Sequence, residues 1–302
     1  MYPQAIPIVE ALLESDSLPS SYAEDSERWF LPLADELLAQ LQSQRGKTLL
    51  WGINGAQGTG KSTLAKLLTL LVENQGYSVA NLSIDDFYLG KAAREELARN
   101  THPLFRTRGV PGTHDTALLE ATLCQLGEAD NSTAVSIPRF DKATDDRLPE
   151  SSFDRIQGPV DLVILEGWMV GATPQPDEEL TPACNALEQD EDEDGRWRLA
   201  VNAALAGHYQ ALFAKLDFLV MLRAPSFEQV YQWRGLQEQK LAASRGQGNA
   251  VMNEAQLQRF IQHYERLTRH CLRTLPNRAD VVFLLDAGHR VVSRADNATR
   301  KS

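Results

Sequence analysis

The sequence predicts an α/β fold in which a parallel β-sheet is covered by helices on both faces. Short apolar runs typical of buried strands recur at 48–54, 78–84, 134–137, 162–165, 218–222 and 281–285. Helical patterns lie between most of these runs, and strands that alternate with helices form parallel sheets. Glycine-rich sequence follows the first run directly, so the first strand is expected to enter its helix through a tight turn.

The composition of the chain bounds its class. Of its 302 residues, 43% are hydrophobic and 24% are charged, close to the average of soluble globular proteins. No apolar run approaches the roughly 18 residues of a membrane span, and three scattered cysteines cannot form a disulfide framework. The net charge of -11 disfavours general binding to nucleic acid or to an anionic membrane. We expect a cytoplasmic protein without those two partners.

Two domains are expected along the chain. Residues 1–46 are predicted to form an N-terminal helical appendage, because apolar residues recur at helical spacing from Phe30 to Leu41. Residues 47–302 are predicted to form the domain that carries the chemistry. Within it, the acidic and proline-rich segment 173–195 is expected to be a mobile surface excursion, and 226–252 is a candidate lid with a polar, glycine-bearing tip.

The strongest motif is Gly-Ala-Gln-Gly-Thr-Gly-Lys-Ser at 55–62, which matches the phosphate-loop pattern between a predicted strand and a predicted helix. Glycines let successive N–H groups face a phosphate, and the helix N-terminus adds its positive end. Lys61 is expected to reach the β- and γ-phosphates and Ser62 to bind Mg²⁺. The motif predicts a P-loop NTPase-type fold and a site for ATP or GTP. The expected nucleotide contacts are Gly55, Ala56, Gln57, Gly58, Thr59, Gly60, Lys61, Ser62 and Thr63.

Carboxylates follow two of the predicted strands, at the edge where open parallel sheets bind ligands. Asp85 or Asp86 could accept a proton from a hydroxyl that attacks the γ-phosphate, although paired aspartates are also typical of turns and helix caps. If the strand continues this far, its alternation points the two side chains in opposite directions, so only one faces the phosphate. Glu166 takes the position of the carboxylate on the Mg²⁺ side.

Further polar side chains mark a candidate acceptor site. They are Arg108, His114, Asp115, Arg139, Asp141 and Arg147. A small polyhydroxy or carboxylated substrate needs groups of this kind, but solvated loops have a similar composition. Arg234 lies on a predicted helix, where it either closes over the phosphates as charge develops or faces solvent.

Six motifs in this order resemble the D-glycerate 3-kinase family of plants, fungi and bacteria: the phosphate loop, SIDDFY, RGVPGTHD, IPRFDK, LEGWMVG and YQWRGLQEQKL. The resemblance covers about residues 48–285, and the wider group includes uridine kinase, phosphoribulokinase and bacterial pantothenate kinase. It implies that Asp85 is the catalytic base, that Glu166 is the Mg²⁺-side carboxylate and that Arg234 lies on the lid side. It also implies substrate-holding segments around Asp115, Arg139, Asp141 and Arg147.

The sequence and the resemblance together predict an ATP-dependent, Mg²⁺-using kinase. The expected acceptor is the hydroxyl of a small hydroxy acid, with D-glycerate converted to 3-phosphoglycerate, and the expected catalytic residues are Lys61, Asp85 and Arg234. One alternative is a sister kinase that acts on a nucleoside, pantothenate or another polyol. Another alternative, of a different class, is a nucleotide-binding regulatory or chaperone-like module.

Overall fold

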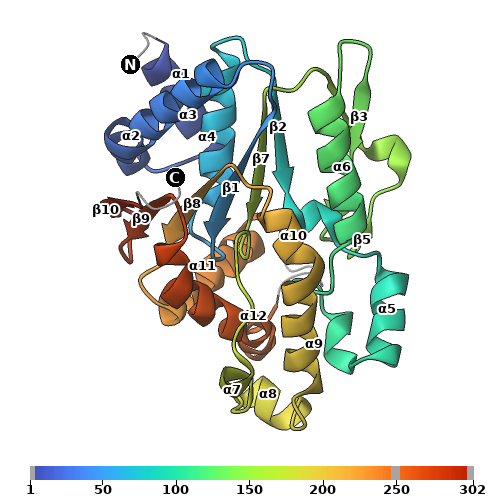
Figure 1. Ribbon diagram of the computed structural model, residues 1–302. Coiled ribbons are helices and arrows are strands. Elements are labelled where there is room, and N and C mark those ends of the chain that lie inside the picture. Colours follow the sequence, from blue (N-terminus) through green and yellow to red (C-terminus); the bar gives the residue numbers. More distant parts are fainter. Residues whose placement is uncertain (1–3, 246–251, 298–302) are drawn as a thin grey trace.

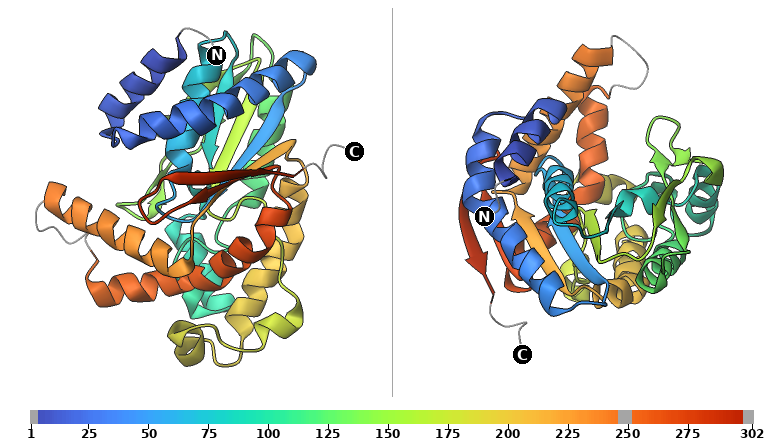
Figure 2. Two further views of the ribbon diagram at one scale, coloured as in Figure 1. Left: turned by 90° about the vertical axis from the view of Figure 1, so that its left-hand side faces the viewer. Right: turned by 90° about the horizontal axis from the view of Figure 1, so that it is seen from above.

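A six-stranded β-sheet forms the centre of the computed structural model, which describes residues 4–245 and 252–297. Its strands are β1 (Leu49–Gly55), β2 (Val79–Ser83), β7 (Leu162–Gly167), β8 (Phe218–Arg223), β9 (Val281–Leu285) and β10 (Val291–Asp296). The strand order is β10-β9-β8-β1-β7-β2, and all neighbours are parallel except β10 and β9. Helices cover both faces of the sheet (Figure 1, Figure 2), so the predicted α/β fold is confirmed.

Helices from the N-terminal part of the chain cover one face of the sheet (Figure 2). They are α1 (Ala5–Asp16), α2 (Ser21–Asp25), α3 (Leu31–Ser43) and α4 (Lys61–Glu73), with a π-helical turn at Ser26–Phe30 between α2 and α3. Leu12 of α1 and Leu37 of α3 are buried in one cluster with Leu68 of α4 and Phe283 of β9. The helices within 1–46 therefore share their hydrophobic core with the sheet.

The other face is covered by helices from later in the sequence. They are α6 (Thr116–Glu128), α10 (Gln210–Phe213) and α12 (Glu254–Thr274), and α11 (Phe227–Arg245) packs on α12. Trp197 of α9 (Arg196–Ala204) is instead buried in a separate cluster with Leu104 and Phe105. Leu119, Tyr209 and Leu267 share a second buried cluster with Val163 of β7. A π-helical turn at Leu205–Tyr209 with non-helical angles at Gly207 separates α9 from α10.

Two strands differ from the predicted pattern. The 134–137 run forms β3 (Ala134–Ile137), but β3 pairs antiparallel with β6 (Asp154–Gln157) in a separate two-stranded sheet. Including it among the strands of the parallel sheet was wrong, since a four-residue apolar run carries no information on its partner. β10 was not predicted because most of its residues are exposed, as expected for an edge strand without an apolar run. A small hairpin, β4 (Phe140–Asp141) and β5 (Asp146–Arg147), follows β3.

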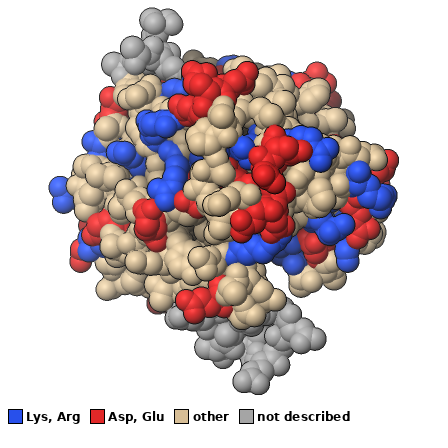
Figure 3. Space-filling view, turned by 90° about the horizontal axis from the view of Figure 1, so that it is seen from below, with Lys and Arg blue, Asp and Glu red and all other residues tan. Residues whose placement is uncertain are grey.

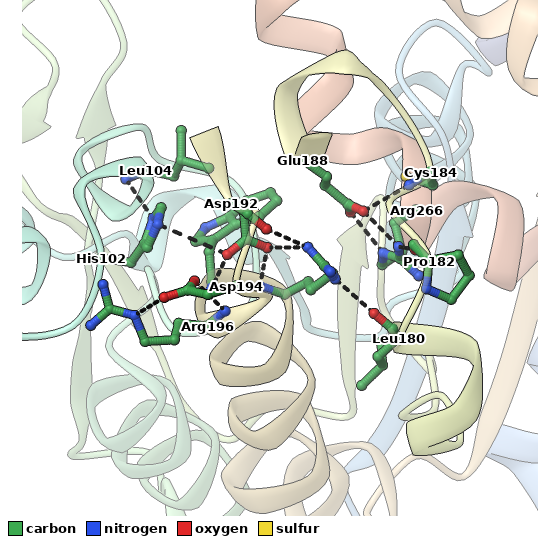
Figure 4. A network of polar contacts seen from close by, with 12 residues as sticks. His102, Leu104, Leu180, Pro182, Cys184, Glu188, Asp192, Asp194, Arg196 and Arg266 are labelled. Atoms are coloured by element: carbon green, nitrogen blue, oxygen red, sulfur yellow. Dashed lines mark hydrogen bonds and ion pairs between the residues drawn. The ribbon is translucent and has the colours of Figure 1, made fainter. Parts of the chain in front are cut away.

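The acidic segment 173–195 carries two short helices, α7 (Asp177–Leu180) and α8 (Ala186–Glu191), and two of its carboxylates are buried. Glu188 pairs with Arg266 of α12 at 2.5 Å, and Asp192 pairs with Arg198 of α9 at 2.9 Å (Figure 4). Acidic and basic side chains are interspersed on the molecular face seen from below Figure 1 (Figure 3). The segment expected to be a mobile surface excursion is therefore anchored by internal ion pairs.

The end of this segment, just before α9, forms a junction with the region after α5 (Lys91–Asn100) (Figure 4). Ligand atoms of His102, Asp192 and Asp194 lie within 4.8 Å of one another. Asp192 already accepts hydrogen bonds from the backbone of Trp197 and from Arg198, and Nδ1 of His102 accepts one from the Leu104 N–H. Nε2 of His102 lies 3.9 Å from Oδ1 of Asp192, so these side chains are occupied by one another and by the backbone, and we interpret this group as a structural junction.

The candidate lid coincides largely with α11, and the part of its tip at 246–251 lies outside the described residues. None of the helices in the described part of the chain combines the length and apolarity that crossing a bilayer requires.

Candidate active site

The phosphate loop joins β1 to α4 with the geometry that its glycines require. Gly58 and Gly60 both have φ of +85°, a left-handed conformation that favours glycine. A Cβ atom at Gly58 would lie 2.8 Å from Cβ of Trp233, so α11 packs directly on the loop. The loop leads directly into α4, a 13-residue helix, whose N-terminal N–H groups have no intrahelical partners and can bind an anion.

Lys61, Ser62 and Glu166 meet beside this loop. The Ser62 hydroxyl donates to Oε1 of Glu166 at 2.8 Å, and Nζ of Lys61 lies 3.9 Å from Oε2 of the same carboxylate. Glu166 is on β7, next to β1 and β2 in register, and it is only 6% exposed. Its Oε2 atom is buried and has no hydrogen-bond partner among the described residues. These oxygens form a donor set that suits a hard divalent cation.

The side chains of Asp85 and Asp86 point in different directions, but the cause is not the alternation of a strand. β2 ends at Ser83, and the two acids lie in a short 3-10 helix at Ile84–Phe87, in which successive side chains are about 120° apart. Asp86 accepts hydrogen bonds from Arg139 at 2.6 Å and from the Phe140 N–H at 3.2 Å. The strand therefore does not continue as far as the two acids, so the condition for the alternation is not met, although the two carboxylates do face different partners.

Asp85 is held between a buried tyrosine and an exposed lysine. The Tyr88 hydroxyl donates to Oδ1 at 2.8 Å, and Nζ of Lys142 donates to Oδ2 at 2.7 Å. Burial alone would raise the pKa of Asp85, but the charges of Lys142 and Lys61 and both hydrogen bonds lower it to about 2. Burial also raises the pKa of the Tyr88 hydroxyl, which therefore stays a donor. Asp85 is thus an ionised carboxylate within the electrostatic reach of the phosphate-loop lysine.

His114 and Asp115 lie directly against this group. The His114 ring stacks on Tyr88 with centroids 4.5 Å apart, and its Nδ1 is 2.8 Å from the Tyr209 hydroxyl. Burial lowers the pKa of His114 to about 4, so its ring is neutral near pH 7. Asp115 caps α6 by accepting from the Leu118 N–H at 3.0 Å. The structure therefore brings both predicted residues to the Asp85 side of the site.

Three predicted arginines also come together there, each tied to carboxylates of the chain. Arg139 pairs with Asp86 and Asp154, Arg147 with Asp115, and Arg108 with Asp145. Asp141 accepts from the Ala143 N–H and the Thr144 hydroxyl, so it stabilises the turn between β4 and β5. These contacts hold the 106–115 and 139–147 segments against each other.

Arg234 lies on α11, one residue after the tryptophan that contacts the phosphate loop. Its guanidinium carbon is 5.9 Å from the centroid of the Phe260 ring. Burial raises the pKa of the Tyr264 hydroxyl, and the charge of Arg234 acts in the opposite direction. Tyr264 in turn donates to the backbone carbonyl of Arg108 at 3.0 Å. The predicted lid-side residue therefore lies beside Phe260 and Tyr264 of α12, and Tyr264 connects this helix to the 106–115 segment.

Tyr88, Lys142 and Trp233 are contacts that the sequence reasoning missed. All three lie within the quoted motifs DDFY, PRFDK and YQWRGLQEQKL. Their place in these motifs could have pointed to them. Their contacts with Asp85 and with the phosphate loop, however, depend on packing between distant segments.

Comparisons with known proteins found relatives of this chain. A family model described as Methylmalonyl Co-A mutase-associated GTPase MeaB matches residues 21–88, which include the phosphate loop. The uncharacterized kinase mug58 of Schizosaccharomyces pombe is 36% identical over 262 residues, covering 82% of this chain and 90% of that protein. The chloroplastic D-glycerate 3-kinase of Arabidopsis thaliana is 30% identical over 234 residues, covering 75% of this chain and 48% of its own length. This chain thus spans about half of the plant protein.

A solved structure gives the same result. D-glycerate 3-kinase from Cryptococcus neoformans has a TM-score of 0.72 and 26% identity, and the match covers 88% of this chain and 98% of that chain. Fold and site together define the class of this protein, which is a P-loop kinase. Within that class, the chain belongs to the D-glycerate 3-kinase family, and the resemblance inferred from the sequence is confirmed.

Proposed function

We propose that this chain is an ATP-dependent kinase that transfers the γ-phosphate to the 3-hydroxyl of D-glycerate. The observation that carries the proposal is the Asp85 carboxylate, which is ionised, acted on by the charge of Lys61, and distinct from the carboxylate beside Ser62. Only β7 lies between the strand before Asp85 and the strand before the phosphate loop. Transfer to a hydroxyl needs one carboxylate on the metal side and another on the acceptor side.

The nucleotide side is proposed to use residues 55–63. The N–H groups of the loop and of the first turn of α4 hold the phosphates of ATP, and Lys61 contacts the β- and γ-phosphates. Ser62 and Glu166 would hold Mg²⁺, since the buried Oε2 of Glu166 lacks a hydrogen-bond partner among the described residues. When bound, the ion neutralises charge on the phosphate oxygens.

On the acceptor side, Asp85 takes the proton of the attacking hydroxyl. The hydroxyl oxygen forms its bond to the γ-phosphorus while the bond from that phosphorus to the β-γ bridging oxygen breaks, which yields ADP and 3-phosphoglycerate. Arg234 is proposed to stabilise the charge that develops on the transferred group, with α11 acting as the lid. Because Asp85 is ionised at neutral pH, it is ready to accept a proton.

The charges around Asp85 favour a carboxylated acceptor over a neutral one. The cationic side chains of this region are Arg108, Arg139, Lys142 and Arg147. Each of them is paired with a carboxylate of the chain, but the side chain of Lys142 is 61% exposed, and a carboxylate is bound well by a charged donor that a neutral nucleoside does not require. His114, Asp115 and Asp141 stay proposed substrate-side residues. Two relatives whose names specify D-glycerate 3-kinase support this choice.

A coupled ADP-release assay over an acceptor panel tests the proposal. With Mg-ATP, we expect kcat/KM to be highest for D-glycerate among D-glycerate, glycerol, uridine and pantothenate. Better turnover of uridine or pantothenate would contradict the substrate and favour a sister kinase. ADP release that does not depend on any acceptor would instead favour the regulatory module.

A further inference from the structure

Lys142 is the cation that contacts Oδ2 of the proposed base, whose side chain is 23% exposed. It lies in the turn between β4 and β5, with Nζ 2.7 Å from Oδ2 of Asp85 and a side chain that is 61% exposed. The other oxygen of Asp85 is held from the buried side by Tyr88. An acceptor hydroxyl that approaches Asp85 from solvent therefore meets the Lys142 ammonium group.

The arginines of the same region are poorly suited to leave their partners. Arg139 bridges Asp86 and Asp154, and Arg147 contacts both Asp115 and the backbone carbonyl of Tyr88. Recruiting either arginine to a substrate would leave a partly buried carboxylate without its counter-ion, which is strongly unfavourable. These side chains build the site, and their contacts oppose their use as movable anchors.

Lys142 differs from these arginines because Asp85 keeps other stabilising contacts when the lysine moves away. Asp85 would keep the hydrogen bond from Tyr88 and the nearby charge of Lys61, and it would gain the hydroxyl proton of the acceptor as a hydrogen bond. The lysine stem is flexible and its ammonium group is exposed, so moving it by a few ångströms costs little.

We propose that Lys142 determines specificity by exchanging Asp85 for the carboxylate of the acceptor. The inference rests on the proposed function. In a small hydroxy acid the carboxylate and a hydroxyl are separated by only a few bonds, so they match an ammonium group and a carboxylate that lie side by side. Binding of the acid then neutralises its charge and frees the base in the same event, whereas a neutral polyol does not draw Lys142 away.

The test compares D-glycerate with glycerol, in which a hydroxymethyl group replaces the carboxylate. Lys142→Met keeps the length of the side chain and removes its charge. We expect kcat/KM for D-glycerate to fall by about 10- to 100-fold, which is the loss of one charged hydrogen bond. The value for glycerol should change by less than threefold or rise, since the base is no longer covered, so the glycerate-to-glycerol ratio falls.

Lys47→Met is the matched control. Lys47 forms an ion pair with Asp217 at 2.6 Å, its side chain is 57% exposed, and it precedes β1 at the opposite end of the sheet. This control should keep the wild-type ratio. An unchanged ratio in Lys142→Met, or an equal loss with both acceptors, overturns the inference while leaving the proposed function intact. A wild-type enzyme that does not prefer D-glycerate to glycerol overturns both.

Discussion

Replacing Asp85 by asparagine tests whether the Asp85 carboxylate is the general base of the proposed mechanism. Asparagine keeps the size of the side chain and an oxygen that can accept from Tyr88, so the 3-10 helix should persist. It removes the proton acceptor, and loss of a general base costs about 10²–10⁴-fold in rate. At 1.36 kcal/mol per tenfold, this corresponds to about 3–5 kcal/mol in the activation free energy. We expect kcat to collapse with little change in ATP affinity.

Asp86→Asn is the natural control for this variant. Asp86 belongs to the same 3-10 helix, but its charge is used by Arg139 at 2.6 Å, away from the contacts of Asp85. Losing this charged hydrogen bond should lower the free energy of unfolding by about 1–3 kcal/mol and leave kcat within tenfold of wild type. The assay combines ADP release at saturating D-glycerate with calorimetric titration of ATP. A kcat within tenfold of wild type in Asp85→Asn would refute the assignment of the base.

The pH dependence follows from the same contacts. Burial opposes ionisation of Asp85, but Lys142, Lys61 and Tyr88 lower its pKa from 3.8 to about 2. Because the folded pKa lies below the unfolded value, this carboxylate stabilises the fold above about pH 4, and its contribution is lost as the pH falls towards 2. Asp85 should therefore cause no fall in kcat/KM between pH 8 and pH 5. In Lys142→Met the pKa of Asp85 should rise, which a pH–rate profile can measure.

Three further outcomes are expected. Lys61→Ala should abolish phosphoryl transfer without lowering Tm, and wild-type turnover in that variant would exclude the phosphate-loop assignment. Gly58→Ala should lower the free energy of unfolding by at least ~1–2 kcal/mol, which is the cost of placing an alanine in the left-handed conformation, and the new Cβ would also lie 2.8 Å from Trp233. An unchanged midpoint of urea unfolding would be inconsistent with this packing. Arg266→Met should cost about 3–5 kcal/mol in urea unfolding, since fully buried Glu188 loses its counter-ion, and a cost under 1 kcal/mol would contradict the anchoring of the acidic segment.

The class of fold and the residues proposed to bind the nucleotide could be predicted from local features of the sequence. The phosphate loop combines a strand, a glycine-rich turn and a helix within consecutive residues, so its geometry follows from neighbours in the sequence. Glu166 could be predicted for a similar reason, because an apolar run that ends in an acid reports both a buried strand and its end. The alternation of such runs with helices was sufficient for the parallel sheet.

Only the tertiary structure decided how the acceptor side is assembled. The contact of Asp85 with Lys142 spans 57 positions, and that of Glu188 with Arg266 spans 78. Periodicity reports which face of an element is buried, but it does not report which distant charge that element meets. For this reason the partner of β3, the burial of two carboxylates in the acidic segment and the position of Lys142 on the proposed base could not be read from the sequence. Each depends on which segments the folded sheet and helices bring together.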